Sequence, residues 1–328
     1  MLRIFFTTDD IARTRLAAGP DALWETMLSM HVLRGGNRGD PAQADWRRSV
    51  VVDLRMSGVA PRLRTLFALN PATGYFPDFL TPFSAAEGIE AGLEVLASTP
   101  TALVRRDLEV LAADQPMSTD VGALVSAADG AAAMRGLTQT IREYHDLALG
   151  LVWARIEATV EADRGRRIRA VVAQGAEGLL ESLRPTMRWN HGVLDVDYPV
   201  DQEMHLGGRG LLLVPSYFCW RYPVTLLDPS LPPVLVYPAQ REPVPPTLSD
   251  ASRRALAALI GNTRAATLAA IGGGCSTTEL ARRVGVSSPA ASQHATVLRN
   301  AGLITSRREA NTMMHSVTAL GSALLNGS

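Results

Sequence analysis

The chain has little of what marks membrane, secreted and disulfide-bonded proteins. Its 328 residues include only two cysteines, Cys219 and Cys275, which argues against a disulfide framework and against a multi-cysteine metal site. Apolar runs such as 211–214 fall far short of the roughly 18 residues needed to cross a bilayer. The first ten residues lack the apolar core and cleavage site of a secretory signal. We therefore expect a cytoplasmic protein with reduced thiols and no membrane contact.

Lysine is absent as well, because all 32 basic residues are arginine. A phosphate loop needs a lysine, so the glycine turn at 207–210 is predicted to be a hairpin turn and not a nucleotide site. The net charge is zero, but residues 250–328 carry +5 and the remainder carries −5. This asymmetry favours a nucleic-acid partner for the carboxyl-terminal part of the chain.

Aromatic residues make up only 5% of the chain. Five of them are candidates to line an apolar effector pocket, with ordinary core as the favoured alternative: Trp153, Trp189, Phe218, Trp220 and Tyr222. His191, Asp195 and Asp197 alternate along one segment and could collect a cation, but a solvated strand edge is favoured. No metal site and no cofactor are predicted.

Proline marks a domain boundary. Seven prolines between residues 228 and 247 surround one short apolar run, 234–237, and prevent a regular helix there. We interpret 235–237 as the last strand of a first domain. The prediction is a domain at 1–240, a proline-rich linker at 241–248 and a second domain at 249–328.

The first domain is predicted to be α+β and mainly helical, with a small antiparallel sheet. Strands are expected at 2–7, 192–198, 203–206 and 211–214, the last two forming a hairpin; helices are expected at 22–33, 89–113, 121–133 and 134–172. The arginines at 164, 166, 167 and 169 are expected to form a solvated helix face. This domain is assigned a sensing or dimerisation role.

The second domain is predicted to be a winged helix-turn-helix. Helices are expected at 250–260, with Leu256, Leu259 and Ile260 inward, and at 263–271. Thr277 or Thr278 should cap a helix at 279–284, glycine at 285 supplies the turn, and Ser287 or Ser288 caps the recognition helix. Strands at 303–307 and 313–318 form the wing. The buried set of the helix pair is predicted to be Leu280, Ala281, Val284, Val286, Ala291, Ala295 and Leu298.

The opposite face of the recognition helix is polar and made of short side chains, as a helix that enters the major groove requires. Gln293 suits adenine, while Arg282, Arg299 and the wing arginines suit phosphate. His294 is more often structural than a base contact. The predicted DNA-binding residues are Thr278, Arg282, Ser287, Ser288, Pro289, Ala290, Ser292, Gln293, Thr296, Arg299, Arg307, Arg308 and Asn311.

Residues 277–287, the triplet 292–294 and residues 297–304 resemble the winged-helix domain of ArsR-type bacterial regulators. The resemblance spans most of 250–325 and implies a homodimer, an effector that changes DNA affinity and repression of nearby genes. Metal-sensing members carry a cysteine pair where this chain has Ser276 and Thr278, so metal sensing through that site is not expected. Residues 1–240 are similar to the amino-terminal extension of a subgroup of these regulators.

The sequence therefore predicts a dimeric repressor that binds double-stranded DNA and responds to a small-molecule effector. An enzyme in 1–240 with a regulatory winged helix is the alternative, but no catalytic triad, phosphate loop or dinucleotide fingerprint supports it, so no enzyme is predicted. A winged helix that binds only protein is the third hypothesis. The +5 charge of the carboxyl-terminal region weighs against it.

Overall fold

A computed structural model describes residues 1–35, 41–71, 74–114, 119–126, 128, 130–220, 222–240, 256–271, 275–309 and 312–326. Internal contacts divide the chain into two compact units, Met1–Gln240 (unit 1) and Arg241–Ser328 (unit 2). The linker predicted at 241–248 lies outside the described residues. None of the described helices combines the length and apolar character that a bilayer crossing demands.

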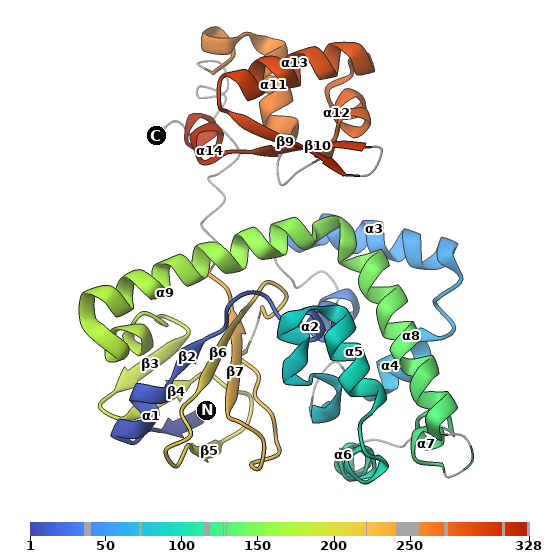
Figure 1. Cartoon of the computed structure of the whole chain (residues 1–328), viewed down its shortest axis with the longest axis vertical. Helices are drawn as coiled ribbons and strands as arrows, with labels where there is room; N and C mark the ends of the chain where they lie inside the picture. The colour runs from blue at the N-terminus through green and yellow to red at the C-terminus, as the bar shows by residue number, and fades with distance from the viewer. Residues whose placement is uncertain are drawn as a thin grey trace. The chain divides into compact units, whose positions relative to one another are not determined.

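Unit 1 is a helical body joined to two small sheets (Figure 1). Its helices are α1 (Thr8–Arg13), α2 (Ala22–Arg34), α3 (Pro41–Ser57), α4 (Leu63–Leu69), α5 (Ile89–Ala97), α6 (Thr101–Asp114), α7 (Thr119–Gly122), α8 (Gly130–Ala148) and α9 (Trp153–Glu181). Short 3-10 turns are η2 (Asp78–Leu80), η3 (Phe83–Glu87), η4 (Ala123–Val125) and η5 (Gly150–Val152). The α+β class predicted from the sequence is confirmed.

The first sheet has the order β3 (Met187–Asn190), β4 (Val193–Val196), β1 (Leu2–Phe5) and β5 (Gln202–His205). It is antiparallel except at β1 and β5, which run parallel, with Leu2 opposite Gln202. The second sheet is parallel throughout, in the order β2 (Arg15–Leu16), β6 (Leu212–Ser216) and β7 (Val234–Pro238). A parallel sheet was not foreseen in the sequence.

The second sheet lies between two apolar cores, which explains its unbroken apolar strands. Val214 and Val236 face the helical core around α2, whereas Leu213, Leu235 and Tyr237 face the core of the first sheet. Successive residues of a strand point to opposite faces, so both faces of β6 and β7 are buried. The last strand predicted at 235–237 is confirmed within β7.

The hairpin predicted across 207–210 is wrong, because β5 and β6 belong to different sheets. The glycine turn instead carries the chain from one sheet to the other. Gly210 has φ +74°, and a Cβ there would lie 2.5 Å from the carbonyl oxygen of Arg13. Its N–H donates to Asp10 Oδ1 at 2.9 Å, so α1 fixes the turn.

Unit 2 has a helical segment at 256–260 followed by α11 (Asn262–Ile271), α12 (Thr277–Val284), α13 (Ser288–Asn300) and α14 (Ala319–Asn326). Its three-stranded sheet has the order β8 (Cys275–Ser276), β10 (Thr312–Val317) and β9 (Ile304–Glu309). Leu268 and Ile271 are fully buried in its core, as predicted. Leu259 is not, because 70% of its surface is exposed while its neighbour Leu256 turns inward.

Candidate nucleic-acid interface

The pair α12 and α13 forms the helix-turn-helix. Ser276, and not Thr277 or Thr278, caps α12 by accepting the Glu279 N–H at 3.2 Å, which corrects the predicted cap. Gly285 ends α12 in the left-handed conformation at φ +71°. Ser287 then caps α13, whose first turn holds a proline that needs no amide donor. These local signals set the turn between the two helices.

One face of each helix is sealed into the core of unit 2. Leu280, Ala281, Ala291, Ala295 and Leu298 are all at most 6% exposed. The predicted Val284 and Val286 pack against the same core but are only partly buried. Because the inner face of α13 is packed into the apolar core, its outer face is exposed to solvent and can contact a ligand.

That outer face carries the predicted reading residues. Ser287, Ser288, Pro289, Ser292, Gln293, Thr296 and Arg299 are exposed, and Ala290 is half-buried. Thr296 Oγ1 donates to the Ser292 carbonyl at 2.9 Å, so this hydroxyl is held against the helix. His294 is half-buried between the two faces. The amide of Gln293 is the largest neutral hydrogen-bonding group on this surface.

The wing is the hairpin of β9 and β10. Arg307 pairs in register with Met314 and Arg308 with Met313, and both arginines are exposed. Adjacent strand residues point to opposite faces, so the two guanidinium groups leave the hairpin on different sides. The predicted contact at Asn311 lies outside the described residues.

A buried histidine, missed in the sequence, joins the wing to the helix-turn-helix. His315 on β10 is 4% exposed; its Nε2 lies 2.9 Å from Thr277 Oγ1 and its Nδ1 lies 2.8 Å from Ser306 Oγ. Burial, and secondarily the Arg299 charge, lower its pKa, so the ring is neutral near pH 7. The sequence pattern could have indicated this burial, because His315 lies two residues before Val317 in the strand and side chains two residues apart point to the same face.

Charges at the start of the motif are partly paired within the protein. Arg282 and Arg283 both bind Glu279, at 2.7 and 2.8 Å, and hydrogen bonds from these two side chains lower the Glu279 pKa to about 2. Arg282 and Thr278 are nevertheless exposed. Phosphate binding by Arg282 would therefore compete with its ion pair, whereas Arg299 and the wing arginines lack such an acidic neighbour among the contacts described.

The aromatic set predicted as an effector pocket is not brought together as a whole. Phe218, Trp153 and Trp220 belong to the helical core. Trp189 lies in the other core, where its ring meets Phe6 at 5.2 Å and its Nε1 donates to Glu177. The second sheet separates these two cores, so Trp189 does not share a pocket with the others. Tyr222 is half-buried.

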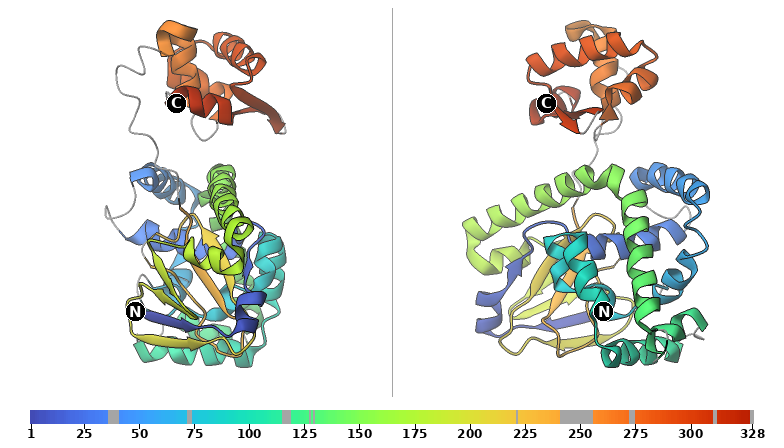
Figure 2. Two further views of the ribbon diagram at one scale, coloured as in Figure 1. Left: turned by 90° about the vertical axis from the view of Figure 1, so that its left-hand side faces the viewer. Right: turned by 45° about the vertical axis from the view of Figure 1, so that its right-hand side comes forward.

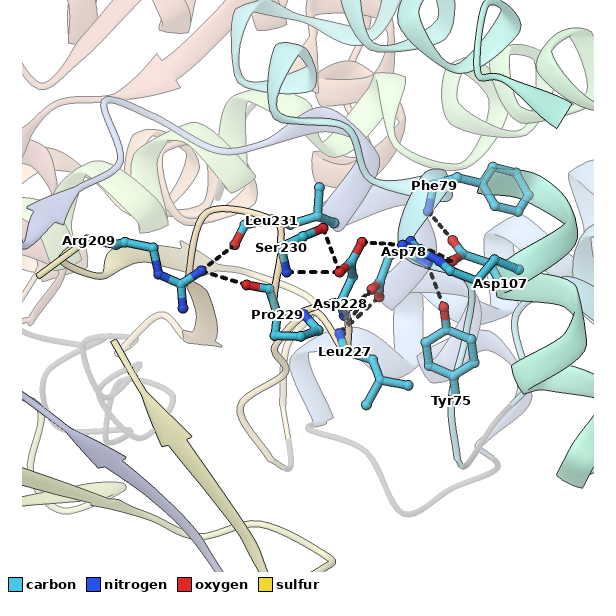
Figure 3. A network of polar contacts seen from close by, with 11 residues as sticks. Tyr75, Asp78, Phe79, Asp107, Arg209, Leu227, Asp228, Pro229, Ser230 and Leu231 are labelled. Carbon is cyan, nitrogen blue, oxygen red and sulfur yellow. Dashed lines mark hydrogen bonds and ion pairs between the residues drawn. The ribbon is translucent and has the colours of Figure 1, made fainter. Parts of the chain in front are cut away.

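Three carboxylates of unit 1 converge around the loop that follows β6 (Figure 3). Asp78 accepts the N–H groups of Leu227 and Asp228, and Asp107 accepts the N–H of Phe79 at 3.0 Å. Burial raises the Asp78 pKa to about 6. Arg106 closes the network at 2.6 Å from Asp228. Because backbone amides occupy these oxygens, the network fastens the loop and does not resemble a pair of free catalytic carboxylates.

An open pocket of about 520 Å³ lies elsewhere in unit 1, beside the kink of α9, and is lined by Ile11, Gln174, Ala176, Glu177, Gly178 and Glu181. Within the residues described, no group of three histidine, cysteine or acidic side chains could hold a metal ion.

Residues 267–305 match the protein family described as winged helix-turn-helix DNA-binding. The match covers α12, α13 and the start of the wing, the same elements that the geometry brings together. No curated protein and no solved structure is significantly similar to the chain. The chain thus carries a winged helix-turn-helix DNA-binding domain, which supports its being a DNA-binding regulator.

Proposed function

We propose that the protein is a homodimeric, cytoplasmic repressor of the ArsR type that binds double-stranded DNA through α13 and the wing. The observation that carries this proposal is the recognition helix α13: one face is buried in the core of unit 2 through Ala291, Ala295 and Leu298, and the other exposes polar side chains from Ser292 to Arg299. Residues 250–328 carry a charge of +5 and the rest of the chain carries −5, so DNA phosphates are attracted to the carboxyl-terminal region.

Unit 1 has the proposed role of sensing and dimerisation. Among the described residues, four buried side-chain polar atoms have no hydrogen-bond partner, and two of them, Gln43 Oε1 and His145 Nε2, support a small effector. The amide nitrogen of Gln43 donates to the Tyr217 carbonyl at 3.2 Å, and the His145 ring lies 5.4 Å from Trp153. Unpaired buried polar atoms are costly and can be satisfied by a ligand with matching groups.

The test is an electrophoretic mobility shift with the DNA upstream of the protein's own gene. Each phosphate that an arginine neutralises should add about −0.9 to the slope of log affinity against log salt. A two-fold dimer should protect half-sites about 10 base pairs apart or a multiple of that spacing. A fragment of equal length and shuffled sequence is the control. An affinity independent of salt, or no binding to either fragment, would refute the proposal.

A further inference from the structure

The long helix α9 has an outer face that the rest of unit 1 leaves uncovered. Its inner face is defined by Ile156, Val160, Asp163 and Arg167, each at most 2% exposed. Figure 1 and Figure 2 show α9 running from the helical body to the sheets along one edge of the unit. The residues three and four positions apart on the opposite side are Ala158, Glu161, Gly165, Ile168 and Val172.

This outer face exposes large apolar side chains as well as charged ones. Ile168 is 46% exposed and Val172 is 83% exposed. Gly165 stands midway between the apolar pair and Ala158, and a Cβ built there meets only the Arg169 guanidinium, at 3.4 Å. Two helices can approach closely at a position without a side chain. The helix interior is a costly place for glycine, so close packing there would compensate for it.

Charge is distributed along the same face with opposite signs on the two sides of Gly165. Glu161 lies four residues before it and Arg169 four residues after it, and both are exposed. Glu161 binds Arg164 of its own helix, and 66% of its side chain remains exposed. A second copy of α9 running in the opposite direction would therefore meet each acid with a base.

We propose that two copies of the chain dimerise through α9, packed antiparallel about a two-fold axis at Gly165. Residues equally far before and after Gly165 then face one another. Glu161 meets the partner's Arg169, and Val172 covers the partner's Ala158. Parallel packing would instead place like charges together, which disfavours it.

The inference deepens the proposed function, because it assigns the dimer of that proposal to one surface. The same helix also holds Gln240, the last described residue before unit 2: Asp163 Oδ1 accepts the Gln240 N–H at 3.0 Å, and Arg166 binds its carbonyl. An α9 dimer would thus fix the two points from which the DNA-binding domains are tethered.

Sedimentation equilibrium of the full-length chain tests the surface. We expect a dimer at micromolar concentration, and at least a 100-fold weaker association for Ile168→Glu and for Gly165→Leu. Ile168 is exposed, and a Cβ at the half-buried Gly165 meets only the end of the Arg169 side chain, so circular dichroism and the melting temperature should stay near the wild-type values. Val95→Glu, at an apolar position 44% exposed on α5, is the matched control and should remain dimeric.

Charge exchange and cross-linking test the direction of packing. Glu161→Arg and Arg169→Glu should each weaken the dimer, and the double variant should restore it. Gly165→Cys should form an intersubunit disulfide under mild oxidation, because the two copies of residue 165 meet at the axis. Val172→Cys should not, since the two copies of residue 172 would lie about 21 Å apart along the helices. The native thiols, Cys219 and Cys275, are both buried.

A wild-type monomer at tens of micromolar, or disulfides from both cysteine variants, would overturn the proposal. A dimer that survives Ile168→Glu and Gly165→Leu would also overturn it, by assigning association to another surface. A dimer formed by another surface would leave the proposed function standing, whereas a wild-type monomer would also contradict its homodimer. The mobility-shift assay tests DNA binding separately from both.

Discussion

The two units of the chain treat charged groups in opposite ways. Unit 1 takes charges into its interior: Glu25, Asp163 and Arg167 are each at most 2% exposed, and each is hydrogen-bonded. Unit 2 seals an apolar core behind α13 and leaves Gln293 and the wing arginines outside. A buried polar group whose hydrogen bonds are all made within the protein helps to fix the fold. A polar group on the solvent side of a helix whose other side is packed into the core can bind a ligand.

The buried ion pair of α9 provides the strongest test of this contrast. Arg167 binds Asp163 through Nε at 3.2 Å and through its terminal nitrogen at 2.9 Å, and Tyr237 donates to the same carboxylate at 2.7 Å. Arg167→Met would leave the carboxylate buried with only its longer ion pair to Arg166, at 3.4 Å. We expect it to lower the free energy of unfolding of unit 1 by about 3–5 kcal/mol.

Urea unfolding followed by tryptophan fluorescence measures this effect in unit 1 alone, because all five tryptophans lie within 1–240. Glu90→Gln removes the exposed ion pair with Arg142 and is the control, with an expected loss of about 0–1 kcal/mol. The double variant Asp163→Leu with Arg167→Met should lose less stability than Arg167→Met alone. Equal losses of unfolding free energy for Arg167→Met and Glu90→Gln would show that the buried ion pair contributes no more to stability than the exposed one.

The dependence of stability on pH should also differ between the units. Burial raises the pKa of Asp21 and of Glu25 to about 7, against hydrogen bonds that lower it. A folded-state pKa above the unfolded value means that folding favours the protonated acid. Unit 1 should therefore lose stability as pH rises from about 4.5 to about 7, by about 3 kcal/mol from Glu25 alone.

Unit 2 should respond in the other direction. The pKa of Glu279 and that of His315 are both lowered on folding, so their contributions are present at neutral pH. The His315 contribution is lost as pH falls below about 6.5, and that of Glu279 as pH falls from about 4.5 toward 2. Hydrogen exchange of α13 amides between pH 5 and 8 reports on unit 2, and tryptophan fluorescence on unit 1. Glu25→Gln should flatten the profile of unit 1; parallel pH profiles for the two units would contradict the expectation.

The same division explains which features could be predicted from sequence. The helix-turn-helix depends on local signals: the Ser287 cap, the left-handed Gly285 and apolar residues at 291, 295 and 298. These act within a few residues of one another, so the exposed face of α13 followed from the pattern. The wing histidine did not, because Thr277, Ser306 and His315 meet only after the strands pair.

The failures in unit 1 share a non-local cause. The parallel pairs of β1 with β5 and β2 with β6 join residues about 200 positions apart, so the apolar runs alone suggested a hairpin. Arg167 was grouped with three neighbouring arginines as a solvated face, yet it is 2% exposed. Its burial depends on Tyr237 and on the carbonyl of Ser182, which the spacing along α9 does not reveal. Trp189 was likewise grouped with aromatic residues of the other core, since composition does not show which side of a sheet a ring occupies.

The smallest and most selective effect is expected for substitutions of exposed residues of unit 2, and it concerns DNA recognition. Gln293 is an exposed amide on α13, whereas Arg307 is an exposed charge on the wing. Gln293→Ala should cost about 1–3 kcal/mol on the preferred operator and little on other sequences, because it removes hydrogen bonds to one base. Arg307→Ala should weaken all sequences alike and reduce the salt slope by about 1.

Competition mobility shifts with single-base operator variants separate the two roles. Leu259→Ala is a suitable control, because Leu259 is exposed in unit 2 but lies outside the recognition helix and the wing. If Arg307→Ala changed base preference while Gln293→Ala weakened all sequences equally, the wing would read the bases and α13 would bind the backbone. The exposure of one face of α13 would then not identify the residues that recognise bases in this protein. The difference in net charge between the two units would still favour DNA binding by unit 2.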